Sequence, residues 1–97
     1  MSGNIRVTPN ELRTVAGQYG TESGNVSELV SRLDNMRDHL RSIWEGASSD
    51  AFAQQYEELK PSFVQMSTLL EEVSQQLNKS ANILEETDQQ IASQIRG

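Results

Sequence analysis

The side chains able to do chemistry in this sequence are a single histidine and scattered hydroxyls and carboxylates. His39 is the only histidine, and the chain has no cysteine. Nucleophilic catalysis needs a nucleophile, a base and an orienting group around a pocket, and a structural zinc site needs clustered His or Cys ligands. His39 has no such neighbours in the sequence, so we expect an exposed or half-exposed structural residue. We predict no enzyme, no metal site and no cofactor.

A second kind of chemistry is recognition by apolar anchors around a charge. Near the carboxyl end an apolar stripe with an aspartate in its middle recurs at helical spacing: Leu77, Ala81, Leu84, Asp88, Ile91 and Ile95. Residues three and four apart share one helix face. Asp88 is then either a surface imperfection or the polar contact that fixes the register of a bound partner, and the pattern alone leaves both open.

Composition limits what else the chain can bind. It has 97 residues, 35% of them apolar and 5% aromatic, and a net charge of -6. Such a small apolar content favours association with another chain. The acidic balance disfavours nucleic acid and anionic membrane surfaces. No apolar run is long enough for stable membrane insertion, and Met1 to Val7 shows no signal-peptide pattern, which alone would indicate a cytoplasmic protein.

The elements that must position these residues are two helices in a single domain, 1–97. Thr8, Pro9 and Glu11 form a helix start, and Gly46 suits a tight turn. We predict a helix over about 9–43, a turn over 44–47, a second helix over about 48–84 that continues through Pro61 with a bend, and a tail over 85–97. Because the connection is short, the helices should run antiparallel.

Large apolar residues keep a heptad rhythm along both predicted helices, and we expect these rows to pack against each other. On the first helix the rows are Leu12, Tyr19, Val26, Leu33 and Leu40, with Val15, Leu29, Met36 and Ile43, the second row being interrupted by Glu22. On the second they are Phe52, Tyr56, Leu59, Phe63, Met66, Leu70, Val73 and Leu77. Folding at Gly46 leaves residues past about Leu84 unpaired, so the tail should be frayed in the free protein.

A second face of the first helix carries small residues: Ala16, Gly20, Ser23, Ser27 and Val30. Small side chains let another helix approach closely, so this row is a candidate dimer interface. The alternative is a locally weak helix, since each glycine in a helix costs about 1 kcal/mol of helix stability relative to alanine. Trp44 also has two interpretations. It packs the end of the hairpin, or it is exposed as a recognition residue.

The whole chain resembles the WXG-motif family, the EsxA/EsxB-like proteins related to the early secreted antigenic target. The resemblance rests on about a hundred residues, no cysteine, two helices, and Trp44-Glu45-Gly46 at the break between the heptad rows. Leu84, Asp88, Ile91 and Ile95 match the family's carboxyl-terminal secretion signal, hydrophobic-xxx-Asp-xx-hydrophobic-xxx-hydrophobic. Actinobacterial members have Tyr at the Leu84 position, so this chain is more similar to low-GC Gram-positive members, which commonly form homodimers.

The resemblance implies an all-α antiparallel two-helix hairpin that dimerises into a four-helix bundle, with itself or with a paralogous chain. It implies a type VII secretion substrate, cytoplasmic before export, secreted without a cleaved signal peptide and engaged by the type VII secretion ATPase. Outside the cell it would act by protein–protein interaction, as a virulence or export-assisting factor. The alternatives are an intracellular coiled-coil adaptor and, less favoured by charge and hydropathy, a membrane-disrupting effector.

Overall fold

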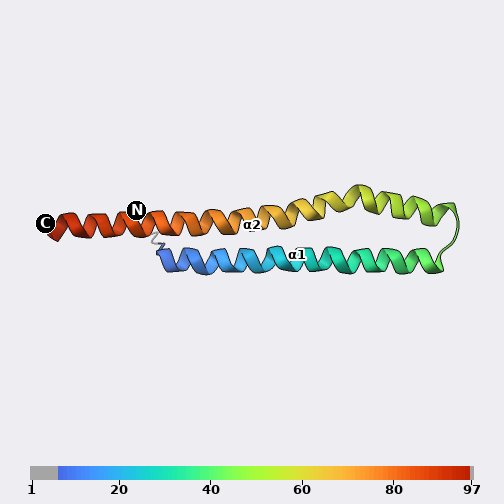
Figure 1. The fold of residues 1–97 in the computed structure, drawn as a ribbon, viewed down its shortest axis with the longest axis horizontal. Coiled ribbons are helices and arrows are strands. Elements are labelled where there is room, and N and C mark those ends of the chain that lie inside the picture. Colours follow the sequence, from blue (N-terminus) through green and yellow to red (C-terminus); the bar gives the residue numbers. More distant parts are fainter. Residues whose placement is uncertain (1–6, 97) are drawn as a thin grey trace.

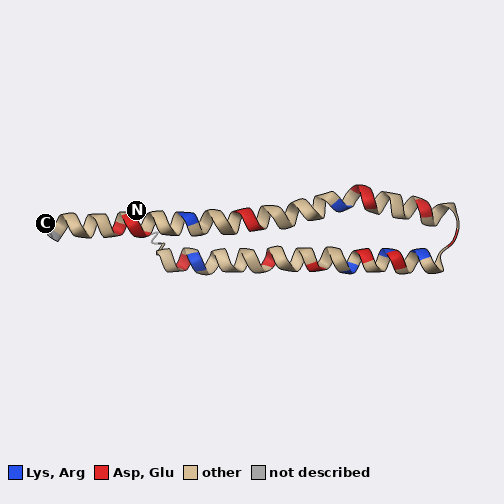
Figure 2. Ribbon diagram, viewed as in Figure 1, with Lys and Arg blue, Asp and Glu red and all other residues tan. Residues whose placement is uncertain are grey.

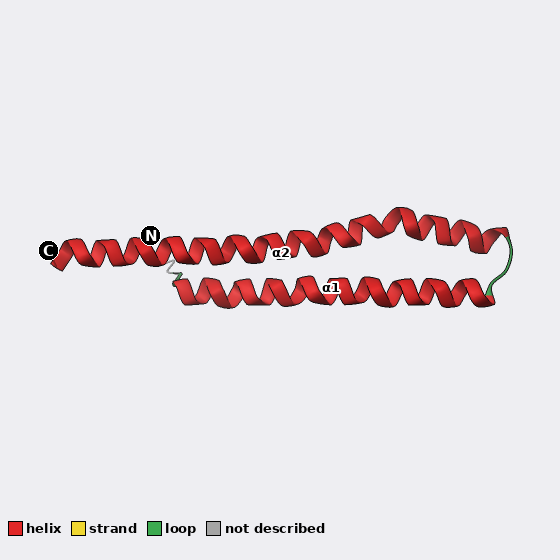
Figure 3. Cartoon of the chain, in the orientation of Figure 1, coloured by secondary structure: helices red, strands yellow, loops and turns green. Residues whose placement is uncertain are grey.

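The protein is a long antiparallel helical hairpin (Figures 1 and 3). A computed structural model describes residues 7–96 and contains α1, Pro9–Ile43, and α2, Ala47–Arg96. The hairpin measures 77 × 23 × 17 Å, which confirms the predicted two-helix hairpin. The segment 1–6, where no signal peptide was expected, and Gly97 at the end of the predicted tail lie outside the described residues.

Local chemistry sets the helix ends and the turn. The Thr8 hydroxyl oxygen accepts a 3.1 Å hydrogen bond from the Glu11 backbone N–H, and Pro9 occupies the first turn, where its missing N–H is tolerated. The Trp44 N–H donates to the Leu40 carbonyl at 2.8 Å, and Trp44 is already extended. Gly46 then has φ +108°, a left-handed conformation that disfavours any side chain. Its carbonyl accepts from the N–H groups of Ser49 and Asp50, which starts α2.

Small residues form the contact between α1 and α2, which we call the seam. Its buried members are Ala16, Ser23 and Val30 on α1 and Ser49, Ala53, Ser74 and Ala81 on α2. Ala16 and Ala81 have no exposed surface. Because these side chains are short, the two helix backbones approach closely along this line.

The large heptad rows mostly flank the seam, so the prediction that they pack the hairpin holds only for their half-buried members, which on α2 are Tyr56, Leu70, Val73 and Leu77. Four row residues, Val15, Leu29, Phe52 and Val73, stand one position before a seam residue and are therefore rotated from it by about 100°. Since α1 and α2 run in opposite directions, this rotation brings the rows of both helices to the same broad side of the hairpin. Four α1 members next to the seam are half-buried: Leu12, Val26, Leu33 and Leu40.

Helix α2 is longer than expected and continues without a break past the start of α1. It includes Pro61 and bows away from α1 in this region (Figure 1), as expected for an exposed proline that removes one backbone hydrogen bond. The structure corrects the predicted end near residue 84, because α2 is helical to Arg96, whereas fraying of the tail stays a prediction. A segment that extends an existing helix needs no new nucleus, and this explains the continuation.

Candidate interaction surfaces

One side of the hairpin presents large apolar side chains and is called here the apolar face. Its members are 38–65% exposed: Val15, Tyr19, Leu29, Met36, Ile43, Trp44, Phe52, Leu59, Phe63 and Met66. Tyr19 on α1 and Leu70 on α2 line the same shallow hollow, in agreement with one shared face. An apolar surface of this length on a small protein, interrupted here by Glu22, indicates a contact with another protein.

Trp44 and Gly46 form the turn at one end of this face. The Trp44 ring lies 5.9 Å from the Phe52 ring, at an interplanar angle of 45°. Trp44 is also 38% exposed. The tryptophan thus packs against the start of α2 and still offers surface to a partner, so parts of both sequence interpretations are compatible with its position.

The small-residue row of α1 lies in the seam, and the expectation that it is free for a second chain is wrong. The Ser23 hydroxyl donates to the Ser67 carbonyl at 2.7 Å, and the Ser67 hydroxyl donates to the Ser23 carbonyl at 3.0 Å. The Ser27 hydroxyl is 2.8 Å from that of Ser67, and Val30 is buried. A Cβ added to Gly20 would lie 3.4 Å from Ser74 Oγ. These hydroxyl-to-backbone bonds require close helices, which explains the small residues.

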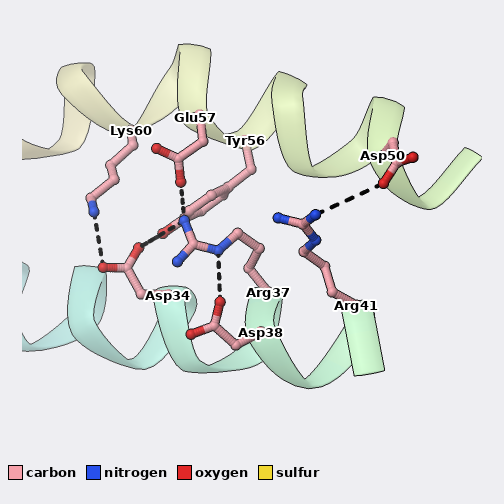
Figure 4. Close-up of polar contacts among 8 residues, drawn as sticks. All are labelled: Asp34, Arg37, Asp38, Arg41, Asp50, Tyr56, Glu57 and Lys60. Carbon is pink, nitrogen blue, oxygen red and sulfur yellow. Dashed lines mark hydrogen bonds and ion pairs between the residues drawn. The ribbon is translucent and has the colours of Figure 1, made fainter. Parts of the chain in front are cut away.

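The half of the seam nearer the turn contains a charged cluster that the sequence analysis missed (Figure 4). Asp34 accepts hydrogen bonds from the Tyr56 hydroxyl at 2.8 Å and from Lys60 Nζ at 3.0 Å. The Arg37 guanidinium lies 5.4 Å from the centre of the Tyr56 ring and forms an ion pair with Glu57. The signal was present, because Asp34 and Arg37 continue the four-and-three spacing of Ser27 and Val30.

The cluster changes the acid–base behaviour of two of its members. The hydrogen bonds from Lys60 and Tyr56 lower the pKa of the Asp34 carboxyl, with the nearby charges of Lys60 and Arg37 acting in the same direction. Burial raises the pKa of Tyr56, and the bond to Asp34 adds to that rise. Both shifts favour the charged Asp34 and the neutral Tyr56 seen in the hydrogen-bonding pattern.

Ion pairs join the two helices, both of which carry acidic and basic residues along their length (Figure 2). Arg13 pairs with Glu85 at 2.9 Å, Arg41 with Asp50 at 3.9 Å, and Arg37 with Glu57. The arginines come from α1 and the acids from α2. They position one helix against the other. Because their side chains are partly exposed, each pair contributes only modestly to the stability of the hairpin.

The carboxyl-terminal stripe projects beyond the hairpin (Figure 1). Leu84 is half-buried, whereas Asp88, Ile91 and Ile95 are exposed, Ile95 to 81%. Asp88 stands seven residues after the buried Ala81, and Ile95 seven after Asp88. The stripe is therefore the continuation of the seam past the start of α1, where α1 no longer covers it.

The remaining candidate chemistry is sparse in the described part of the chain. His39 is exposed, and its backbone carbonyl accepts a hydrogen bond from the Ser42 hydroxyl. Within residues 7–96 no three His, Cys, Asp or Glu side chains gather in a way that could hold a metal ion. Neither described helix has a stretch apolar enough to cross a membrane.

Comparisons with known proteins agree with this architecture. Residues 4–89 match the model of the WXG100 family, described as proteins of 100 residues with WXG. The Protein YukE of Bacillus subtilis is 63% identical over 97 residues and covers both chains fully. The Type VII secretion system extracellular protein A of Staphylococcus aureus strain USA300 is 33% identical over 89 residues, 92% of each chain. A crystal structure of Geobacillus thermodenitrificans EsxA superimposes with a TM-score of 0.84 at 67% identity, over 94% of this chain and 100% of that one.

Proposed function

The chain belongs to the WXG100 family, and from this membership we propose that it is a secreted type VII secretion substrate that acts by protein–protein contact. The matching relative from Staphylococcus aureus is named a type VII secretion system extracellular protein. The surfaces of the hairpin fit such a role, because they offer exposed apolar side chains for contact.

The observation that carries the proposal is the exposed apolar face. Leu59 is 54% exposed and Met36 59%, and burying such side chains gains about 25 cal/mol for each Å² removed from water. A second hairpin that presents the same face would cover both rows and produce a four-helix bundle. We infer a homodimer, with a paralogous chain of similar face as the alternative partner. The interface then differs from the small-residue row that the sequence suggested.

The carboxyl-terminal stripe is the proposed secretion signal. Asp88, Ile91 and Ile95 are exposed, so a partner can bind them without opening the hairpin. Amphipathic helices commonly bind in grooves through anchors at this spacing. The proposed partner is the type VII secretion ATPase, which would receive the apolar side chains of Ile91 and Ile95 and place a donor or a cation against Asp88. After export the protein would act as a virulence or export-assisting factor.

Export can be tested in the bacterium that encodes the chain. Cell and supernatant fractions are probed for four strains: wild type, a deletion of the secretion ATPase, a deletion of residues 86–97, and Asp88→Ala. We expect the wild type in the supernatant, both deletions retained in cells, and reduced export of Asp88→Ala. A cytoplasmic enzyme serves as the lysis control.

The residues before position 86 are kept because Leu84 is half-buried and Glu85 contacts Arg13. The truncated protein should therefore remain folded, which circular dichroism of the purified variant checks. Retention of the wild type in cells, with no dependence on the ATPase, would instead favour the intracellular adaptor. Normal export of the truncated chain would show that the stripe is not the signal.

A further inference from the structure

The side chain of Arg13 connects the start of α1 to the point where α2 leaves the hairpin. Its Nη2 donates to Asn82 Oδ1 at 3.0 Å and to Glu85 Oε1 at 2.9 Å. Its Nη1 donates to Glu85 Oε2 at 3.4 Å and to Asn10 Oδ1 at 3.1 Å. The guanidinium is thus held by both oxygens of one carboxylate and by two amides. A planar, forked donor of this kind fixes direction as well as distance.

This contact lies at the root of the projecting stripe. Within the described residues, no other hydrogen bond or ion pair between the helices is nearer to the carboxyl end. Ala81 is fully buried and Leu84 half-buried, whereas residues 86–95 are exposed. Glu85 therefore separates the part of α2 that packs on α1 from the part that does not, and it stands between Leu84 and Asp88 of the stripe.

Whether the projecting part of α2 stays helical depends on the turn that Arg13 holds against α1, residues 82–85. An isolated helix of about a dozen residues is marginal in water, because its first turn is costly to form. The projecting part avoids that cost only while the turn before it stays helical. If residues 82–85 come free of α1, fraying can begin one turn earlier and include Leu84.

We propose that Arg13 is a positioning residue for the carboxyl-terminal stripe: it fixes the last paired turn of α2, so that Leu84, Asp88 and Ile91 are presented on one helical face. The expected effect on export rests on the proposed function. The claim that Arg13 fixes the last paired turn of α2 rests on the contacts alone. Arg13 does not belong to the stripe and need not contact the partner that reads it.

The test compares two matched arginines at opposite ends of the hairpin. Arg13→Gln removes the charge beside Glu85, and Arg41→Gln removes the equivalent charge beside Asp50. The exchanged pair Arg13→Glu with Glu85→Arg restores an ion pair in the reverse sense. Hydrogen exchange of the amides in residues 84–95 and export to the supernatant are measured for each variant, with wild type and the 86–97 deletion alongside.

We expect Arg13→Gln to speed exchange in residues 84–95 by roughly two- to fivefold, the range of a partly exposed ion pair, and to reduce export. Arg41→Gln should change neither, and the exchanged pair should return exchange toward the wild-type rate. Exchange that is unchanged in Arg13→Gln, or equally raised in Arg41→Gln, would overturn the inference. Full export of Arg13→Gln despite faster exchange would overturn its role in export. Export of the 86–97 deletion would instead refute the proposed signal itself.

Discussion

The Ser74 hydroxyl donates a 2.7 Å hydrogen bond to the backbone carbonyl of Ala16, and both residues are buried between the helices. A side chain this short can reach the opposite backbone only if the helices lie close together. The bond therefore shows why the seam consists of Ala, Gly and Ser, and it makes the seam sensitive to added volume.

Enlarging Ala16 should destabilise the hairpin. Ala16 has no exposed surface, so Ala16→Leu forces the helices apart and should lower the free energy of unfolding by about 1–3 kcal/mol. Ala51→Leu, at an exposed position of α2, is the matched control and should have little effect. Urea denaturation measures both. Equal stability of the two variants would contradict the seam described here.

Two glycines of α1 should be replaceable with a gain in stability. A Cβ added to Gly17 or Gly24 would meet nothing within 4 Å, and alanine loses less conformational entropy in a helix. We expect each Gly→Ala change to raise the free energy of unfolding by roughly 0.5–1 kcal/mol. Gly46→Ala should lower it, because of the positive φ of Gly46. If Gly17→Ala or Gly24→Ala weakened the dimer, a second chain would have to contact α1 at these two glycines.

The proposed dimer can be tested with two separate variants, each with a glutamate at one of two positions that lie two residues apart. Leu29 lies on the apolar face, and Ser31 lies on the other broad side of α1. Leu29→Glu should bury a charge in each half of the interface and weaken the dimer by at least about tenfold. Ser31→Glu should not. Sedimentation velocity over a concentration series gives the dissociation constants. A monomeric wild type at micromolar concentration would rule out the homodimer.

Removing Lys60 should raise the pKa of Asp34, since the hydrogen bond from Lys60 is the largest cause of its lowered value. A carboxyl with a lowered folded-state pKa stabilises the fold above its unfolded pKa, about 3.9. That stability is lost as the pH falls through the lower, folded-state value. Lys60→Met should therefore make the melting temperature fall less than in the wild type when the pH is lowered from neutral to that value. Lys79→Met is the exposed control, and a carbon-13 titration of the Asp34 carboxyl follows the pKa directly.

The turn and the helix ends could be predicted from short-range signals. Thr8 and Pro9 act within the first turn, and Gly46 requires only its own backbone conformation. The end of α2 was harder to predict, because no local stop signal marks it and a helix already anchored at Glu85 continues past the point where its tertiary contacts end.

The candidate site was predictable in part. The stripe of Leu84, Asp88, Ile91 and Ile95 follows from spacing alone, and the structure adds that it continues the seam. The charged cluster around Asp34 and Arg37 escaped notice because charged residues are ordinarily placed at the surface. Their spacing shared the phase of the small-residue row, but only the position of α2 shows that Tyr56 and Lys60 lie opposite.

The sequence by itself determined that two helices fold back at Gly46 and that α1 carries two neighbouring stripes, one large and apolar, the other small. It did not determine which stripe faces α2, because both repeat with the same period and differ only by a rotation of about 100°. The tertiary structure decided this through backbone distance. Ser23, Ser67 and Ser74 bond to opposite carbonyls only when the helices are close, and residues as large as Leu29 or Phe63 cannot fit in that space. The more exposed members of the large stripes, such as Leu29 and Phe63, therefore remain on the outside, where they are accessible to a second chain.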